Sequence, residues 1–209
     1  MKIAKFSTIV KFFVRIPKLN LNQTRKLAKY MTMKGRFILD ETHSAILFRI
    51  KHLGITTITG CFKEFSGEAS FETADFSGAS ISFEAQTQSI CTRHEERDEH
   101  LRSVDFFHAS AFPTFNFHSS SFKLLTNNQY KLTGYLEIKG IRNQQEFLVQ
   151  YNGAAKDQFG KTRIGFDLRG VIDRRDYTLD WNLISELGTL VLAEKVELDF
   201  SLQLLLTKD

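Results

Sequence analysis

Residues 92–107, TRHEERDEHLRSVDFF, combine two histidines with arginines and acids and then turn apolar. On a helix, His94 and His100 are six residues apart, about 240° around the axis, so they do not chelate one ion together. His94 and Asp98 are four apart and share a face, and so do Glu96 and His100. Two ligands without a third from elsewhere make a poor metal site. We expect neither a metal nor a catalytic residue here and favour a polar helix with a structural role.

The composition predicts a large apolar interior. The 209 residues include 20 Phe but one Trp and two Pro. Phe has no polar group, so these side chains must line either a packed core or a cavity. Residues 1–36 carry ten of the 28 Lys and Arg residues and none of the 24 acids, so the remainder holds 18 bases and a net charge of −6. An acidic domain argues against nucleic-acid binding.

Residues 1–35 form a basic arm ahead of a domain at residues 36–209. Residues 1–18, MKIAKFSTIVKFFVRIPK, place apolar and basic side chains on different faces of a helix. Such a helix lies on an anionic membrane surface. Charges interrupt its apolar run and no small-residue cleavage site follows, so it is not a convincing secretion signal. We expect a cytoplasmic or peripherally membrane-associated protein. The alternatives are the periplasm, an arm packed on its own domain, and a true start at Met31 or Met33.

From residue 36 onward, apolar residues recur with a period of two. The stretch KVELDFSLQLLLTK alternates apolar with mostly polar residues, and so do YKLTGYLEIKG, EFLVQYNG and RIGFDLRGVID. HSAILFRIKHLG, ASISFEAQ and PTFNFHSSSF also have strand patterns. Gly and Asn residues separate these segments. The pattern predicts seven or eight antiparallel strands, each with one apolar face.

Such a sheet must hide one apolar face, and closure into a barrel does so while removing the sheet edges. We predict an all-β fold, a closed eight-stranded antiparallel β-barrel, with a sandwich as the alternative. Residues 92–108 break the strand pattern and are expected to form a helix that caps one end, with Leu101, Val104, Phe106 and Phe107 as a plug. An eight-stranded barrel is filled by side chains or holds one slim ligand. Both cases need the same inward Phe and Leu residues, so the sequence leaves them open.

Four stretches occur in order: ILDETHSAILFRIKHLGITTITGCFKEFSG, RDEHLRSVDFFHASAFPTFNFHS, YLEIKGI and IDRRDYTLDW. Together they closely resemble the YceI-like family of polyisoprenoid-binding proteins, from about residue 36 to 207. The combination is specific, because it joins a His-Ser after an Asp, an Arg-Asp-x-His-Leu block and a late Arg-x-Asp before a Trp. The resemblance implies a lipocalin-like antiparallel barrel with a lipophilic tunnel for long isoprenoid or fatty chains.

The sequence departs from the family at three places. Arg36-Phe37 stands where the family usually has a Trp near the first strand, and Thr178 stands where a Gly usually follows the Arg-x-Asp. These two departures put the shape and the mouth of the tunnel in question. The basic arm replaces the secretion signal of many members, which puts an envelope location in question.

The Arg-Asp-x-His-Leu block recurs in the family without a redox or hydrolytic role. We interpret Arg97, Asp98 and His100 as scaffold of the capping helix, with a mouth that also meets a polar head group as the alternative. From the resemblance, Arg174 and Asp176 are the expected partners of Arg97 and Asp98. They form either a charge pair that braces the barrel or a fork for a phosphate or quinone oxygen.

The leading hypothesis is a non-enzymatic protein that binds, carries or sequesters a long isoprenoid-type lipid, a polyprenyl compound or quinone, with no other cofactor. The alternatives are an enzyme that acts on a lipid head group through His43, His100 or Asp98, and a filled-barrel protein- or carbohydrate-binding module. The expected partners are this lipophilic ligand and, through residues 1–18, an anionic membrane surface, with no nucleic acid and with homodimer formation left open. The residues expected at the tunnel mouth and walls are His43, Phe48, Arg97, Asp98, His100, Phe106, Phe107, Phe115, Phe117, Arg174, Asp176 and Trp181.

Overall fold

The structure is a computed structural model of the chain. It describes residues 34–73, 76, 78–126, 128–184, 188 and 190–207. The predictions for residues 1–18 and for a start at Met31 or Met33 lie outside the described residues. Within the described part, no helix is both long and apolar enough to cross a membrane.

Strands dominate the described chain, as the period of two predicts. Within the described residues, one α-helix and three short 3-10 helices interrupt them. The elements in chain order are β1 (Gly35–Leu39), η1 (Glu41–His43), β2 (Ala45–His52), β3 (Thr56–Phe62), β4 (Phe65–Phe71), β5 (Ser80–Gln86), η2 (Thr87–Ser89), β6 (Ile90–Cys91), α2 (Glu95–Arg102), β7 (Thr114–Thr126), β8 (Gln129–Ile138), β9 (Ile141–Lys156), β10 (Thr162–Asp173), η3 (Arg174–Tyr177) and β11 (Leu192–Leu206).

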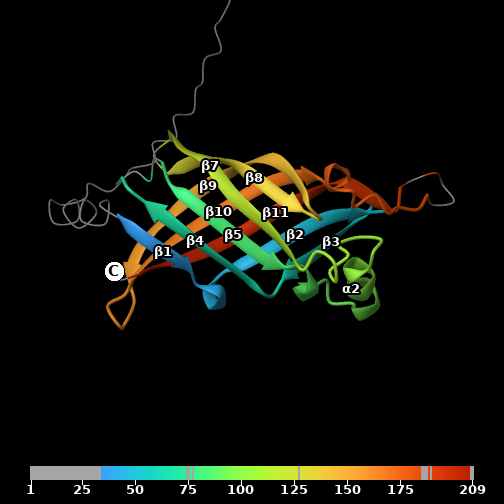
Figure 1. The fold of residues 1–209 in the computed structure, drawn as a ribbon, viewed down its shortest axis with the longest axis horizontal. Helices are drawn as coiled ribbons and strands as arrows, with labels where there is room; N and C mark the ends of the chain where they lie inside the picture. Colours follow the sequence, from blue (N-terminus) through green and yellow to red (C-terminus); the bar gives the residue numbers. More distant parts are fainter. Residues whose placement is uncertain are drawn as a thin grey trace, which may run out of the picture. The chain divides into compact units, whose positions relative to one another are not determined.

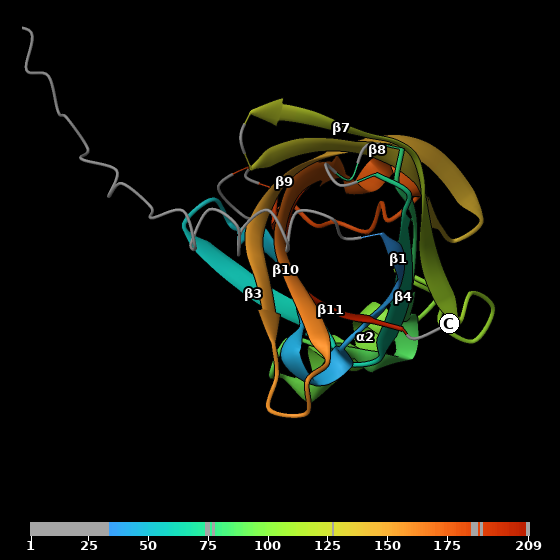
Figure 2. The same cartoon turned by 90° about the vertical axis from the view of Figure 1, so that its left-hand side faces the viewer.

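The strands form one sheet that closes on itself. Their order is β1-β4-β5-β7-β8-β9-β10-β11-β2-β3-β6, and β1 also pairs with β11. β11 pairs with β2 along its first part and with β1 near its end, so β1 and β2 share one position in the ring. β3 pairs with β2 and β4 pairs with β1, so they share the next position. The ring therefore has eight antiparallel strand positions, and the predicted closed barrel is confirmed (Figures 1 and 2).

The predicted inward faces are also correct. On β11, Val196, Leu198, Phe200 and Leu202 face the interior. On β8, the apolar side chains at alternate positions are buried, among them Leu132. Burial of every second residue is the pattern that a closed barrel requires.

β3 and β4 were not predicted as strands. Their inward positions include Gly60 and Gly67, which interrupt the apolar alternation. The ring of Phe48, on the paired strand β2, occupies the space that a Cβ at Gly60 would need. Glycine is thus required at this position because an aromatic ring lies against the wall, which a strand pattern does not reveal.

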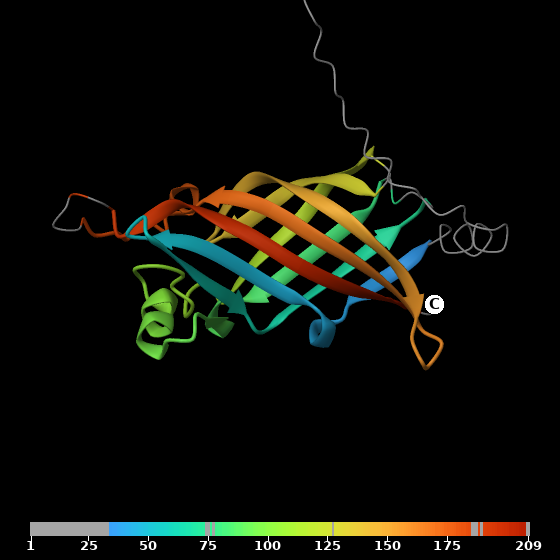
Figure 3. The ribbon, with the colours of Figure 1, turned by 180° about the vertical axis from the view of Figure 1, so that it is seen from behind.

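The predicted helix exists but is shorter than residues 92–108. It covers Glu95–Arg102 and lies at one end of the barrel (Figure 3). The Nδ1 atom of His94, the N-cap residue, accepts a hydrogen bond from the Arg97 N–H at 3.4 Å. The helix ends before Ser103, whose N–H donates to the last turn, and the chain then forms turns up to β7.

Three of the four predicted plug residues face the barrel interior, namely Leu101, Phe106 and Phe107. The expectation for Val104 is wrong, since its side chain is 66% exposed. Val104 follows the end of α2, so it no longer shares the helical face of Leu101.

Aromatic side chains fill the opposite end of the barrel. Phe37 is fully buried there and contacts Phe71. The ring of Phe76 packs edge-on against Phe71 and Phe166, with centroid distances of 4.8 and 5.6 Å. This end of the barrel is therefore a packed core.

Candidate functional site: an apolar barrel cavity

A cavity of about 470 Å³ occupies the end of the barrel nearest α2. A volume of this size lies within the range of roughly 300–1,000 Å³ that is typical of small-molecule sites. Apolar side chains from β2, β3, β5 and β7–β11 make up its walls. The walls include the rings of Phe48, Phe83, Phe115, Phe117, Phe147 and Phe200.

The exposure of inward-facing residues changes along the barrel. On β11, Val196, Leu198 and Phe200 are partly exposed although they face inward, whereas Leu204 on the same face is buried. An inward side chain that remains partly exposed borders empty space, since packed interiors leave few voids. The barrel is thus hollow near α2 and filled at the other end.

Glycines in two strands let aromatic rings lie flat against the cavity wall. A Cβ at Gly134 on β8 would collide with the ring of Phe117, and one at Gly170 on β10 would collide with the ring of Phe147. Any larger residue at these positions would push the rings toward the barrel axis. The strand glycines therefore keep the cavity open.

Polar side chains on the cavity surface gather at the end formed by α2, η3 and the end of β2. They are His52, Thr92, His94, Glu96, Arg97, His100 and Arg174. An apolar chamber with polar groups at one end suits an amphiphile whose chain lies inside and whose polar group stays at that end.

Arg174 is 3% exposed and is held by main-chain carbonyl groups. Its Nε donates to the carbonyl oxygen of Ala193 at 2.9 Å. Its Nη1 donates to the carbonyl oxygens of Leu179 and, at 3.0 Å, Trp181. Burial lowers the pKa of Arg174, but an arginine remains charged in proteins. Arg174 thus ties the segment after η3 to β11 and places a fixed positive charge at the polar end.

Arg97 and Asp98 were expected to bind Arg174 and Asp176, but this pairing is wrong, because Asp98 and Arg97 both bind Thr92. The N–H and hydroxyl groups of Thr92 donate to Oδ1 of the buried Asp98, the N–H at 2.8 Å. The Arg97 guanidinium donates to the hydroxyl and carbonyl oxygens of Thr92 at 2.7 and 2.9 Å. These bonds fix the start of α2 on the chain that leaves β6.

Three rings meet where α2 faces the segment after η3. The His100 ring lies edge-on to Trp181 and Phe106, with centroid distances of 4.7 and 5.1 Å. His100 Nε2 also lies 2.9 Å from Oδ2 of Asp105. His100, Phe106 and Trp181 all line the cavity, so they form a wall at its polar end.

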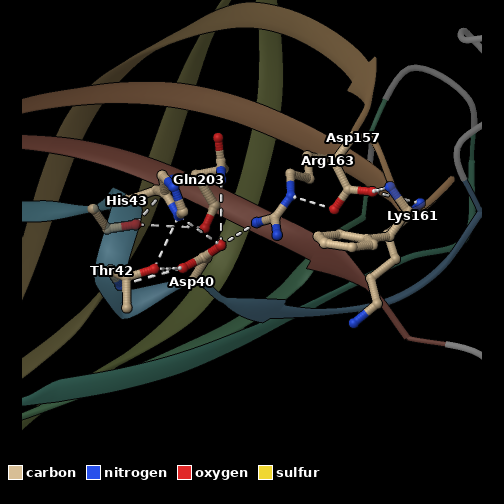
Figure 4. A network of polar contacts seen from close by, with 9 residues as sticks. Asp40, Thr42, His43, Asp157, Lys161, Arg163 and Gln203 are labelled. Carbon is tan, nitrogen blue, oxygen red and sulfur yellow. Dashed lines mark hydrogen bonds and ion pairs between the residues drawn. The ribbon is translucent and has the colours of Figure 1, made fainter.

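His43 lies away from the cavity, in a polar network at the corner between β1 and β2 (Figure 4). Its Nδ1 is 3.1 Å from Oδ2 of Asp40, which also accepts hydrogen bonds from Arg163 and Gln203. Burial opposes ionisation of Asp40, but these bonds and one from Thr42 hold its pKa well below the usual range. The network braces the corner against β10 and β11.

Most of the predicted tunnel residues face the cavity. His43 and Asp98 do not, and neither does Asp176, whose carbonyl oxygen accepts a hydrogen bond from Asn143. The predicted residues on the cavity surface are Phe48, Arg97, His100, Phe106, Phe107, Phe115, Phe117, Arg174 and Trp181.

The predicted set missed several wall residues. Phe83, Phe147 and Phe200 stand at alternating positions of predicted strands, so the period of two was a signal for them. His52 and Thr92 carry no comparable signal, because their place at the polar end depends on how the ring closes.

Within the described ranges, no cluster of three or more His, Cys, Asp or Glu side chains suits a metal ion. Cys61 on β3 and Cys91 on β6 lie opposite each other in the strand register. Both are free thiols. Burial raises the pKa of the Cys61 thiol.

Fold and site together define a closed antiparallel β-barrel with an apolar interior chamber and a polar end. The profile of the YceI-like domain matches residues 37–204, and the chain belongs to this family. A relative is the UPF0312 protein SA2479 of Staphylococcus aureus (strain N315), which is 34% identical over 166 residues. That match covers 79% of this chain and 94% of the relative.

Solved structures share the fold. The Campylobacter jejuni YCEI protein superposes with a TM-score of 0.64 at 28% identity, covering 76% of this chain and 91% of that chain. Burkholderia cenocepacia BcnA gives a TM-score of 0.69 at 22% identity, covering 79% and 98%. A polyisoprenoid binding domain from Saccharophagus degradans gives 0.63 at 16% identity, covering 84% and 100%.

Proposed function

We propose that this protein binds a long isoprenoid-type lipid, a polyprenyl compound or quinone, and carries or sequesters it without catalysing a reaction. The observation that carries the proposal is the apolar chamber of about 470 Å³ with polar side chains at one end. The name of the Saccharophagus degradans domain, which describes polyisoprenoid binding, supports this class of ligand.

Burial of the chain supplies the affinity in this proposal. Each methylene taken from water contributes about 0.8 kcal/mol, so ~15 buried carbons give a gross term of roughly 12 kcal/mol before ordering costs. Unsaturated chains suit the aromatic walls. Arg97, His100 and Arg174 at the polar end are proposed to meet the head group, because charged and hydrogen-bonding groups give such sites their specificity.

Native mass spectrometry of the purified chain, followed by solvent extraction, tests the proposal. We expect a co-purified lipid whose mass identifies it. A matched pair of variants on β11 locates the site. Leu198→Gln places an amide in the chamber wall and should reduce the bound fraction, whereas Glu197→Gln on the exposed face should retain it. A wild-type protein that carries no lipid and takes up no added polyprenol would contradict the proposal.

A further inference from the structure

The chamber is not the whole hollow part of the barrel. A second void of about 60 Å³ lies beyond it, toward the packed aromatic end. Five of the described side chains border both spaces, so they form the boundary between the chamber and the second void. These side chains are Ile81, Phe83, Leu132, Leu168 and Leu202.

Phe83 is the one aromatic residue among these five boundary side chains. It projects inward from β5, and its ring stacks on Phe200 of β11 with a centroid distance of 6.1 Å and an interplanar angle of 25°. β5 and β11 are not neighbours in the sheet, so this contact spans the interior of the barrel. Phe83 also contacts Phe115 and Phe65. Its ring therefore stands in the path from the chamber to the second void.

From this arrangement we propose that Phe83 sets the length of chain that the barrel accepts. The inference rests on the proposed function, because it concerns how deeply a lipid tail enters. A tail that enters from the polar end extends until it meets the Phe83 ring. Carbons beyond that length stay outside the chamber and add no further burial.

The inference has a measurable form. Each additional buried methylene should increase affinity about fourfold. The affinity of wild-type protein should rise with chain length and then level off at the length that reaches Phe83. Removing the Phe83 ring joins the chamber to the second void, so affinity should continue to rise for longer chains.

The experiment uses the full chain, from which bound lipid is first extracted. Cooperative unfolding of the extracted protein then verifies that the barrel has refolded. Saturated straight-chain alcohols and linear polyprenols of increasing length compete with bound parinaric acid, which reports by fluorescence. The variants are Phe83→Ala and the more conservative Phe83→Leu, which keeps an apolar side chain if the alanine variant does not fold. Phe48→Leu is the matched control, since Phe48 lines the chamber but not the second void.

We expect the levelling length to increase in the Phe83 variants, with the longest chains gaining roughly 16-fold or more over wild type, equivalent to two or more extra methylenes. Phe48→Leu should change the affinity at all lengths but leave the levelling length unchanged. Curves that level at the same length in wild type and Phe83→Leu would refute the role of Phe83 and leave the proposed function intact. Failure of wild type to bind any chain would refute both.

Discussion

Replacing Asp98 tests whether hydrogen bonds to Thr92 hold the capping helix α2 on the barrel. Asp98 is 4% exposed and Thr92 is 5% exposed, so the carboxylate and its donors are both removed from water. Asp98→Ala deletes the acceptor of the Thr92 N–H and hydroxyl groups. The Thr92 hydroxyl still accepts from Arg97, but the buried N–H loses its side-chain acceptor.

The expected loss follows from these two bonds. A hydrogen bond to a charged group contributes about 1.5–3 kcal/mol, and a buried donor left unpaired costs about 1–3 kcal/mol. The two bonds share one oxygen and are not additive, so we expect Asp98→Ala to lower the free energy of unfolding by about 3 kcal/mol. Asp98→Asn keeps a carbonyl oxygen that accepts the same bonds without the charge, so its loss should be about half as large.

Urea denaturation followed by circular dichroism measures these losses. Glu99→Ala is the matched control, because Glu99 lies on the same helix with an exposed side chain, and a surface change of this kind stays within about 0.5 kcal/mol. A chelator should leave the wild-type melting temperature unchanged. An Asp98→Ala loss no larger than that of Glu99→Ala would refute the structural role, and a chelator-sensitive wild type would favour a metal site.

Two other predictions concern the barrel itself. Asp40→Asn should lower stability by about 2 kcal/mol at neutral pH, and the difference should vanish in acid. The bonds from Thr42, His43 and Arg163 lower the pKa of Asp40 in the folded state. Asp40 therefore contributes to stability above its unfolded pKa of about 3.9, and this contribution is lost as the pH falls. A stability difference between Asp40→Asn and wild type that does not change with pH would contradict this. Thr178→Gly should stabilise by about 0.5–1 kcal/mol, since Thr178 has φ 52°, a left-handed conformation that favours glycine. Thermal unfolding should therefore show a higher melting temperature for Thr178→Gly than for wild type, and a lower one would contradict this reasoning.

The strands were predictable because a half-buried strand carries its burial pattern in alternate residues. Residues 195–208 place an apolar side chain at every second position from Val196 to Leu206, and β11 covers Leu192–Leu206. The closure of the ring was inferred from the need to hide one face. β3 and β4 were missed because Gly60 and Gly67 interrupt their apolar alternation. These glycines leave space for atoms of other strands, and a local sequence pattern contains no information about such partners.

The site was less predictable than the fold because it depends on contacts between distant segments. The sequence marks Arg97, Asp98 and Arg174 as unusual. It does not show that Arg97 and Asp98 both form hydrogen bonds with Thr92. Arg174 reaches carbonyl groups on both sides of residues 183–190, so its role exists only after the chain returns to β11.

The same distant contacts decide whether this barrel is hollow or filled. Leu198 and Leu204 on β11 both face inward, yet Leu204 is buried and Leu198 is partly exposed. Near Leu204 the interior receives large rings, including Phe166 and, from outside the strands, Phe76. Toward α2, the strands place glycine where the neighbouring strand carries an aromatic ring, so each ring lies along the wall instead of crossing the interior. Total apolar content is therefore a poor guide to a cavity, and the pairing of glycine with aromatic residues across strands is the better one.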